Sequence, residues 1–184
     1  MPIIVIVSKR GDDGMSELGN MLDKLRSGDR KAFEAIYESL KTPLYTIALR
    51  ITHDTALSED VLQEVFLKLY LSPPNPSANP RAYIFRMARN LAIDSARKRK
   101  LTVDLEEAES YLHHPVADIS LKIDIENALL SLSDRERQIV TLHINGDLKF
   151  REVSEIMEMP LGTVLWSYQK AIKQLRNTLT VDSN

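Results

Sequence analysis

The sequence predicts an all-α protein made of two small helical domains joined by an acidic linker, the second a helix-turn-helix. Apolar residues recur at helical spacing along most of the 184-residue chain. The charge also reverses abruptly, from seven basic and one acidic side chain in residues 81–100 to one basic and seven acidic in residues 101–126. Such a reversal marks a domain boundary. We place the linker at residues 101–120.

The amino-acid composition limits the cellular compartment of the protein and the chemistry that its side chains can perform. The hydrophobic fraction of 43% suffices for folded cores. With no cysteine, the chain has no disulfide, thiolate metal site or cysteine nucleophile. The apolar run Ile3–Val7 is too short for a signal peptide core or a membrane span. We therefore expect a cytoplasmic protein without membrane insertion.

The first domain begins with helical patterns that turn-forming residues separate. One follows Gly28-Asp29-Arg30, and another runs from about Pro43 to Thr52. A third starts near Ser58, which suits an N-cap because its hydroxyl can accept from the first-turn backbone. This third helix has an apolar stripe of Val61, Leu62, Val65, Phe66, Leu69 and Tyr70, and a polar outer side of Asp60, Gln63, Glu64 and Lys68.

A loop and an arginine-rich helix complete the first domain. Residues 71–80 carry four prolines and are predicted to form a loop. In the helix that follows, Tyr83 and Phe85 are expected in the core rather than at the surface. The core stripe comprises Tyr83, Ile84, Met87, Ala88, Leu91 and Ala92, and the opposite face carries Arg86, Arg89, Asn90, Ile93 and Arg97.

The second domain ends in a helix-turn-helix spanning Leu148–Leu175. Ser133 and Glu136 form an S-x-x-E capping box that begins the preceding helix. Within the motif, Pro160 separates two amphipathic helices because it lacks a backbone N–H but suits the start of a helix. This arrangement is typical of proteins that insert a helix into the major groove of DNA.

Three segments, in this order and separation, resemble a bacterial extracytoplasmic-function (ECF) sigma factor of the sigma-70 family. They are LSEDVLQEVFLKLY (57–70), NPRAYIFRMARNLAIDSARKRK (79–100) and the segment 130–164. The resemblance covers about residues 16–180 and implies sigma region 2 at 16–100 and sigma region 4 at 121–180. Residues 1–15 form an N-terminal extension, with Met15 an alternative start of translation.

The resemblance implies a transcription initiation factor, not an enzyme, that binds core RNA polymerase, directs it to promoter DNA and assists melting. The resemblance also implies an anti-sigma factor as a further partner of this protein. It implies no cofactor, metal or small-molecule substrate. Core-binding positions are Asp60, Gln63 and Glu64. Positions for the melted minus-ten element are Asn79, Arg81, Tyr83, Arg86, Arg89 and Asn90. Positions for the minus-thirty-five element are Thr163, Trp166, Gln169, Lys170 and Lys173.

Physical chemistry agrees with these positions in part. For the minus-ten positions, single-stranded DNA binds basic grooves that have sites for unstacked bases. For the minus-thirty-five positions, a glutamine such as Gln169 suits adenine, and a lysine such as Lys170 suits guanine or a phosphate. Leu165 and Ser167 depart from the family pattern, in which basic residues grip the DNA backbone there. Trp166 replaces a small polar residue, and packing against a protein partner is its alternative role.

Other sequence features leave two alternatives open. Lys149 stands where the family prefers a hydroxyl cap, which predicts a weak helix start. The linker of roughly 20 residues reaches about 66–72 Å when extended, which is close to two duplex turns of about 34–36 Å each. The resemblance implies that the linker runs through the RNA channel of the polymerase; the alternative is a solvated acidic spacer. A stand-alone helix-turn-helix regulator is the alternative function. No ligand or nucleophile set surrounds His53, His113, His114 or His143.

Overall fold

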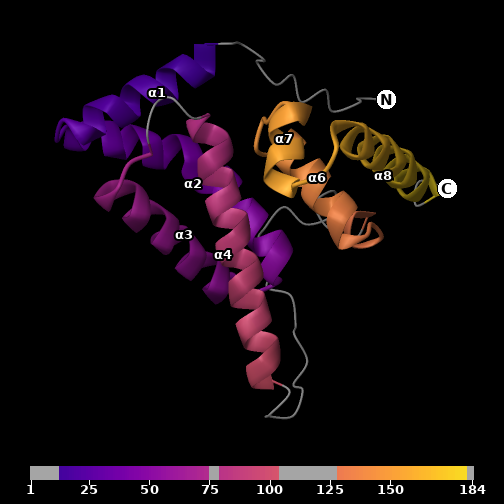
Figure 1. The fold of residues 1–184 in the computed structure, drawn as a ribbon. Helices are drawn as coiled ribbons and strands as arrows, with labels where there is room; N and C mark the ends of the chain where they lie inside the picture. The colour runs from indigo at the N-terminus through magenta and orange to yellow at the C-terminus, as the bar shows by residue number, and fades with distance from the viewer. Residues whose placement is uncertain (1–12, 75–78, 104–127, 182–184) are drawn as a thin grey trace.

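The computed structural model describes residues 13–74, 79–103 and 128–181, and these residues form helices and connections without a strand (Figure 1). The all-α prediction is confirmed. The acidic stretch, with His113 and His114, lies outside the described residues, as does part of the proline-rich loop. The helices are α1 (Asp13–Arg26), α2 (Arg30–Thr52), α3 (Thr55–Leu71), α4 (Pro80–Val103), α6 (Asp134–Ile144), α7 (Phe150–Met157) and α8 (Leu161–Val181).

Helices α1 and α2 differ from the sequence prediction. No helix was predicted ahead of Gly28, yet α1 begins at Asp13. The two helices expected on either side of Pro43 are one continuous helix, so that prediction was wrong. Proline removes one backbone hydrogen bond. Leu40 and Leu44, on either side of Pro43, are fully buried, and their packing stabilises the helix across that gap.

The cap of α3 also corrects the prediction. Asp54, not Ser58, is the N-cap, and its carboxylate accepts a 2.9 Å hydrogen bond from the Leu57 N–H. Ser58 lies one turn inside the helix, fully buried, and its hydroxyl donates to the Asp54 carbonyl. An aspartate four residues before the predicted helix start at Ser58 thus competed successfully for the capping position.

The predicted capping box of α6 is confirmed, with Ser133 and Glu136 bonded reciprocally. At α7, Lys149 makes no side-chain cap, as expected from its type. The Lys149 N–H instead donates to the Glu152 carboxylate over 2.5 Å. Helix α7 ends at Met157, and the capping residue that follows, Glu158, adopts a left-handed backbone with φ of 54°.

The two domains pack against each other. Helix α2 contacts α6 and helix α4 contacts α7, and one buried apolar cluster continues from the first domain into the second. Phe85 is fully buried, as predicted, but Tyr83 is 47% exposed, so its assignment to the core was wrong. A β-carbon at Gly146 would lie only 3.0 Å from the Phe85 ring and 2.5 Å from the Leu142 carbonyl oxygen. Only glycine allows this close approach.

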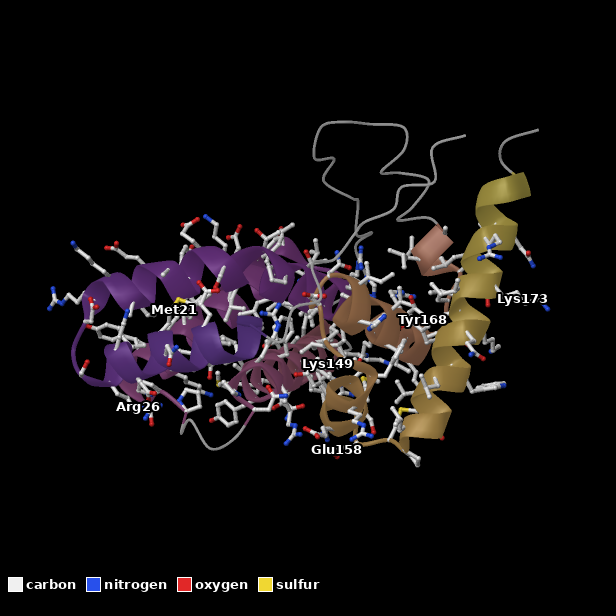
Figure 2. The ribbon with its side chains drawn as sticks, turned by 90° about the horizontal axis from the view of Figure 1, so that it is seen from above. Met21, Arg26, Lys149, Glu158, Tyr168 and Lys173 are labelled. Atoms are coloured by element: carbon white, nitrogen blue, oxygen red, sulfur yellow. The ribbon has the colours of Figure 1, made fainter. Side chains whose placement is uncertain are left out.

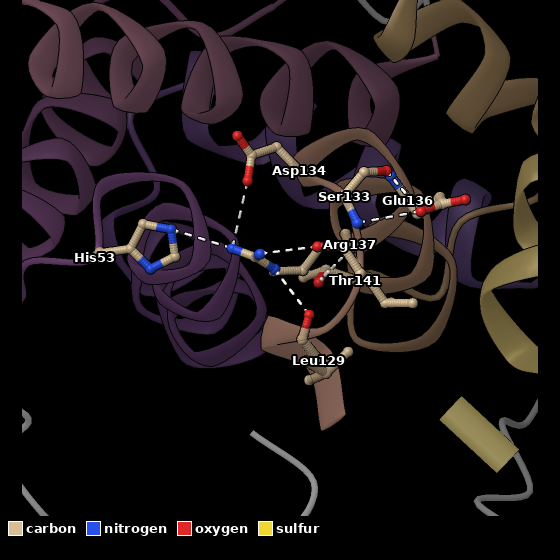
Figure 3. A network of polar contacts seen from close by, with 8 residues as sticks. His53, Leu129, Ser133, Asp134, Glu136, Arg137 and Thr141 are labelled. Atoms are coloured by element: carbon tan, nitrogen blue, oxygen red, sulfur yellow. Dashed lines mark hydrogen bonds and ion pairs between the residues drawn. The ribbon is translucent and has the colours of Figure 1, made fainter. Parts of the chain in front are cut away.

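A buried arginine organises the start of the second domain (Figure 3). The Arg137 guanidinium donates to the Leu129 carbonyl at 3.0 Å and to the Leu132 carbonyl at 3.1 Å. It also lies 3.1 Å from Nε2 of His53, the residue that follows α2. One side chain therefore fixes the turn before α6 and joins it to the first domain.

Burial predicts a large difference between two chemically identical substitutions. Leu44 is fully buried, whereas Leu71 is 71% exposed. We expect Leu44→Ala to lower the free energy of unfolding by about 2–5 kcal/mol, because it leaves a cavity. We expect Leu71→Ala to change it by less than about 0.5 kcal/mol. Urea unfolding followed by circular dichroism measures both, and equal effects would contradict the described packing.

Candidate nucleic-acid and protein interfaces

The outer face of α3 carries the predicted core-binding residues. Asp60, Gln63 and Glu64 are all exposed, and Glu64 forms a 2.8 Å ion pair with Lys68 one turn further on. Leu67 is 57% exposed on the same face. Sequence reasoning missed Leu67, although its spacing of three from Glu64 and four from Gln63 places it among them. This face combines acidic groups with an apolar centre and suits a protein partner.

What we call the α4 cationic surface consists of three arginines of α4 and the asparagine that precedes the helix: Asn79, Arg81, Arg86 and Arg89. The structure brings these residues together, but against the second domain. The Asn79 amide donates to the Glu152 carboxylate at 2.6 Å. The Arg81 guanidinium donates through Nε and Nη2 to the Gly146 carbonyl, at 3.1 and 2.7 Å.

The other two residues of this surface make similar contacts. Arg86 Nη2 donates to the Glu155 carbonyl at 3.1 Å, and Arg89 Nε donates to the Gln138 side-chain oxygen at 2.8 Å. Arg86 Nε is buried and, among the described residues, has no hydrogen-bond partner. Burial lowers the pKa of the Arg89 guanidinium, while Glu158 opposes the shift.

Electrostatics reinforce the contact between the domains. Burial lowers the pKa of the Arg81 guanidinium, and the negative charges of Asp147 and Glu152 oppose that shift. An arginine side chain stays protonated under such conditions. The acidic groups of the second domain therefore compensate part of the cost of removing charged guanidinium groups from water.

The remaining minus-ten candidates stay accessible. Asn90 is exposed. Tyr83 borders a shallow, open hollow on the first domain, which is also lined by Lys68, Leu71, Ser72 and Met87. An exposed tyrosine ring beside an apolar hollow is compatible with stacking by an unpaired base.

The predicted recognition face of α8 is exposed in the described structure. Thr163, Trp166, Gln169, Lys170 and Lys173 all lie outside the core, and Figure 2 shows Lys173 projecting from the outer side of α8. Val164 and Ala171 are buried on the opposite side, as predicted. Ser167 is also buried, so its side chain is not placed to contact a DNA backbone.

One of these side chains already has an acidic partner. Lys170 Nζ forms a 2.8 Å ion pair with the buried Glu136 carboxylate, and it lies 5.6 Å from the centre of the Trp166 ring. The hydrogen bond from Lys170, followed by that from Ser133, lowers the pKa of Glu136. The other candidates on this face, Thr163, Trp166, Gln169 and Lys173, are exposed and make no ion pair with Glu136, and Trp166 is 62% exposed.

The described histidines, His53 and His143, contact residues that hold the fold together. His143 stacks on Phe150 with ring centroids 4.0 Å apart, and its Nδ1 lies 2.8 Å from the Leu148 carbonyl. No group of three or more histidine, aspartate or glutamate side chains in the described residues could hold a metal ion. No described helix is long and apolar enough to cross a membrane.

Two protein families match this chain. Sigma-70 region 2 matches residues 36–102, and Sigma-70, region 4 matches residues 122–175. The ECF RNA polymerase sigma factor SigW of Bacillus subtilis is 27% identical over 176 residues, covering 86% of this chain and 94% of SigW. SigK of Mycobacterium ulcerans is 28% identical over 182 residues, covering 92% of this chain and 97% of SigK.

Solved structures share the fold. The sigma factor RpoE of Bartonella quintana, in complex with the anti-sigma factor NepR, matches with a TM-score of 0.69 and 24% identity, over 83% of this chain and 99% of RpoE. CnrH, in complex with the cytosolic domain of CnrY, matches with a TM-score of 0.65 and 18% identity, over 90% of this chain and 99% of CnrH.

The chain belongs to the ECF sigma factors of the sigma-70 family, and it is therefore a transcription initiation factor. A region 2 domain accompanies the helix-turn-helix in one chain, which does not favour the alternative of a stand-alone regulator. Sigma factors in general are transcription factors rather than enzymes.

Proposed function

We propose that this sigma factor uses three separate surfaces: the α3 face to bind core RNA polymerase, the α4 cationic surface to capture the melted minus-ten strand, and the α8 face to bind the minus-thirty-five duplex. The observation that carries this proposal is the presence of all three in one chain. Each surface has the chemistry its partner requires: acidic and apolar for a protein, guanidinium-rich for a single strand, and amide, amine and indole for base edges.

Within the α3 face, Asp60, Gln63 and Glu64 supply polar and charged contacts, and Leu67 supplies the apolar centre. An exposed leucine surrounded by charged groups fits the usual anatomy of a protein interface, which has an apolar core and a polar rim. On α8, Gln169 reads a base directly. Trp166 contributes apolar contact, for which the thymine methyl group is the matching feature in the major groove.

We further propose a cytoplasmic location and an anti-sigma partner. Support for the partner comes from RpoE and CnrH, whose structures were solved in complexes with NepR and CnrY. Catalysis has no part in this proposal, because the chemistry of transcript synthesis belongs to the polymerase.

The first test concerns dependence on core polymerase. The net charge is −2, and much of the cationic character of α4 is directed at the second domain, so the free chain should bind duplex promoter weakly. Adding core enzyme should produce a stable promoter complex and transcription from promoters selected out of a randomised template pool. Gel shift and run-off transcription measure both. Tight, sequence-specific duplex binding that core does not change would contradict the proposal.

A second prediction concerns α3. Reversing the charge of Asp60 and Glu64 to lysine should weaken core binding by about 10-fold or more, since truncating charged interface contacts costs roughly 2 kcal/mol or more. Glu34→Lys with Glu38→Lys is the matched control, because this exposed pair on α2 has the same spacing. Circular dichroism verifies folding and a core pull-down measures binding. Equal loss in both double variants would indicate a general charge effect instead of a docking face.

A third prediction concerns α8. Gln169→Ala should cost about 1–3 kcal/mol of discrimination at one upstream base pair, with little effect on promoters that lack the upstream element. Lys173→Ala is the control. If Lys173 contacts a phosphate, losing that contact should weaken binding about equally on all sequences. Initiation rates on a set of templates with single upstream base changes measure the difference. If Gln169→Ala lowers initiation equally on all of them, Gln169 is not a base reader.

A further inference from the structure

The Glu136 carboxylate of α6 has both of its oxygens engaged. Its Oε2 accepts from the Ser133 N–H at 3.1 Å and from the Ser133 hydroxyl at 2.6 Å (Figure 3). Its Oε1 lies 2.8 Å from Lys170 Nζ, which comes from the neighbouring helix α8. Because Glu136 is only 5% exposed, removing Lys170 from it would leave a charge with little access to water, which is unfavourable. The carboxylate therefore keeps Lys170 in place.

The same ion pair holds Lys170 near the exposed tryptophan of α8. Trp166 and Lys170 are four residues apart, so they lie on one side of the helix. Lys170 Nζ is 5.6 Å from the centre of the Trp166 ring, within the range of a cation–π interaction. A hollow between the start of α6 and this part of α8 is bordered by Ser133, Glu136, Trp166 and Lys170. Lys170 thus interacts with a fixed carboxylate and with an exposed indole at the same time.

The pairing changes what this part of α8 presents to a base pair. In the major groove a free lysine donates to the O6 and N7 acceptors of guanine, whereas an apolar side chain contacts the methyl group of thymine. Successive bases are about 3.4 Å apart, so groups separated by 5.6 Å contact the same base pair or its neighbour. With the Lys170 ammonium bound to Glu136, the Trp166 indole is the remaining group that can select the base there.

We propose that Glu136 determines base specificity from outside the recognition helix: by holding Lys170 beside Trp166, it makes α8 select thymine where a released lysine would select guanine. The inference rests on the proposed function, since it takes α8 as the helix that reads the minus-thirty-five duplex. Glu136 is a positioning residue that acts through Lys170. Its replacement should therefore change which base is preferred, in addition to how tightly the duplex is bound.

Glu136→Gln releases Lys170 while keeping the start of α6 intact, because a capping box accepts glutamine as well as glutamate. The amide oxygen must take the place of Oε2 to accept from the Ser133 N–H, which turns the amide NH2 toward the Lys170 ammonium. Two donors cannot pair. Asp134→Asn is the matched control, because it removes one negative charge from the same turn of α6, where the Asp134 side chain is 85% exposed. Circular dichroism verifies that both variants are folded.

Selection from a template pool measures base preference. Holoenzyme made with each variant transcribes templates that are randomised in the upstream element and carry a barcode in the transcribed region. We expect the unaltered chain and Asp134→Asn to favour thymine at the base pair where Trp166→Ala loses that preference. Glu136→Gln should raise the guanine-to-thymine ratio there, or at the neighbouring base pair, by about 5-fold or more, as a good base contact does. An unchanged ratio in folded Glu136→Gln would overturn the inference.

Lys170→Met shows whether the effect passes through Lys170. Methionine keeps an unbranched side chain but carries no charge. Combined with Glu136→Gln, it should return the preference to thymine, because no ammonium is left to bind guanine. A guanine preference that persists in this double variant would mean that Glu136 acts by another route, and the positioning role would be rejected. A guanine preference of the unaltered chain that Lys170→Met abolishes would also overturn the inference, because Lys170 would then already contact the base.

Fluorescence tests the positioning without DNA. Trp166 is the only tryptophan of the chain, so its emission reports the motion of this ring without a label. Time-resolved anisotropy of the full chain should show greater local motion of the ring in Glu136→Gln than in the unaltered chain or in Asp134→Asn. Equal local motion in all three would show that the paired ammonium does not hold the ring, and the inference would be rejected.

Gln169→Ala separates failure of this inference from failure of the proposed function. If neither Gln169→Ala nor Trp166→Ala changes the preference at any upstream base pair, α8 is not the reading helix and the proposed function fails at that surface. If both change a preference but Glu136→Gln changes none, α8 reads the duplex and the role of Glu136 is rejected. If only Gln169→Ala changes a preference, Trp166 selects no base and the inference is likewise rejected.

Discussion

The guanidinium groups of α4 join the two domains, because one side of the helix packs in the first domain and the other donates to the second. Toward one side, α4 buries Ala82, Phe85 and Ala88 in the apolar core. Toward the other, Arg81, Arg86 and Arg89 donate to carbonyl and amide oxygens of the second domain. The hydrogen bonds are strong because charge assists them. The relative position of the two domains therefore depends on these hydrogen bonds together with the buried apolar cluster that both domains share.

Local sequence signals predicted the helices well where capping and spacing agreed. The capping box at Ser133 and the turn before α8 were both found, because each depends on residues within one helical turn. The errors at Pro43 and Ser58 came from competition between local signals and packing. Buried leucines on either side kept α2 continuous across Pro43, and Asp54 capped α3 ahead of Ser58.

The site was less predictable than the fold. Spacing predicted that Arg86 and Arg89 share a face of α4, and that Trp166 and Gln169 share a face of α8, since both follow from helical geometry. Spacing did not predict the partners of those faces. The contact of Arg81 with Gly146 spans 65 residues, and the pairing of Lys170 with Glu136 joins two helices. Such contacts depend on tertiary packing, for which one sequence holds no periodic signal.

The ion pair between Lys170 and Glu136 has a consequence for ionic strength. A lysine that neutralises a phosphate displaces a condensed counterion, and each such displacement adds about 0.9 to the slope of log affinity against log salt concentration. Lys170 is already neutralised by a buried carboxylate, so it displaces no counterion while that pair persists. Recognition by α8 would then depend less on salt concentration than its two exposed lysines imply, with Lys173 instead of Lys170 supplying the salt-dependent part.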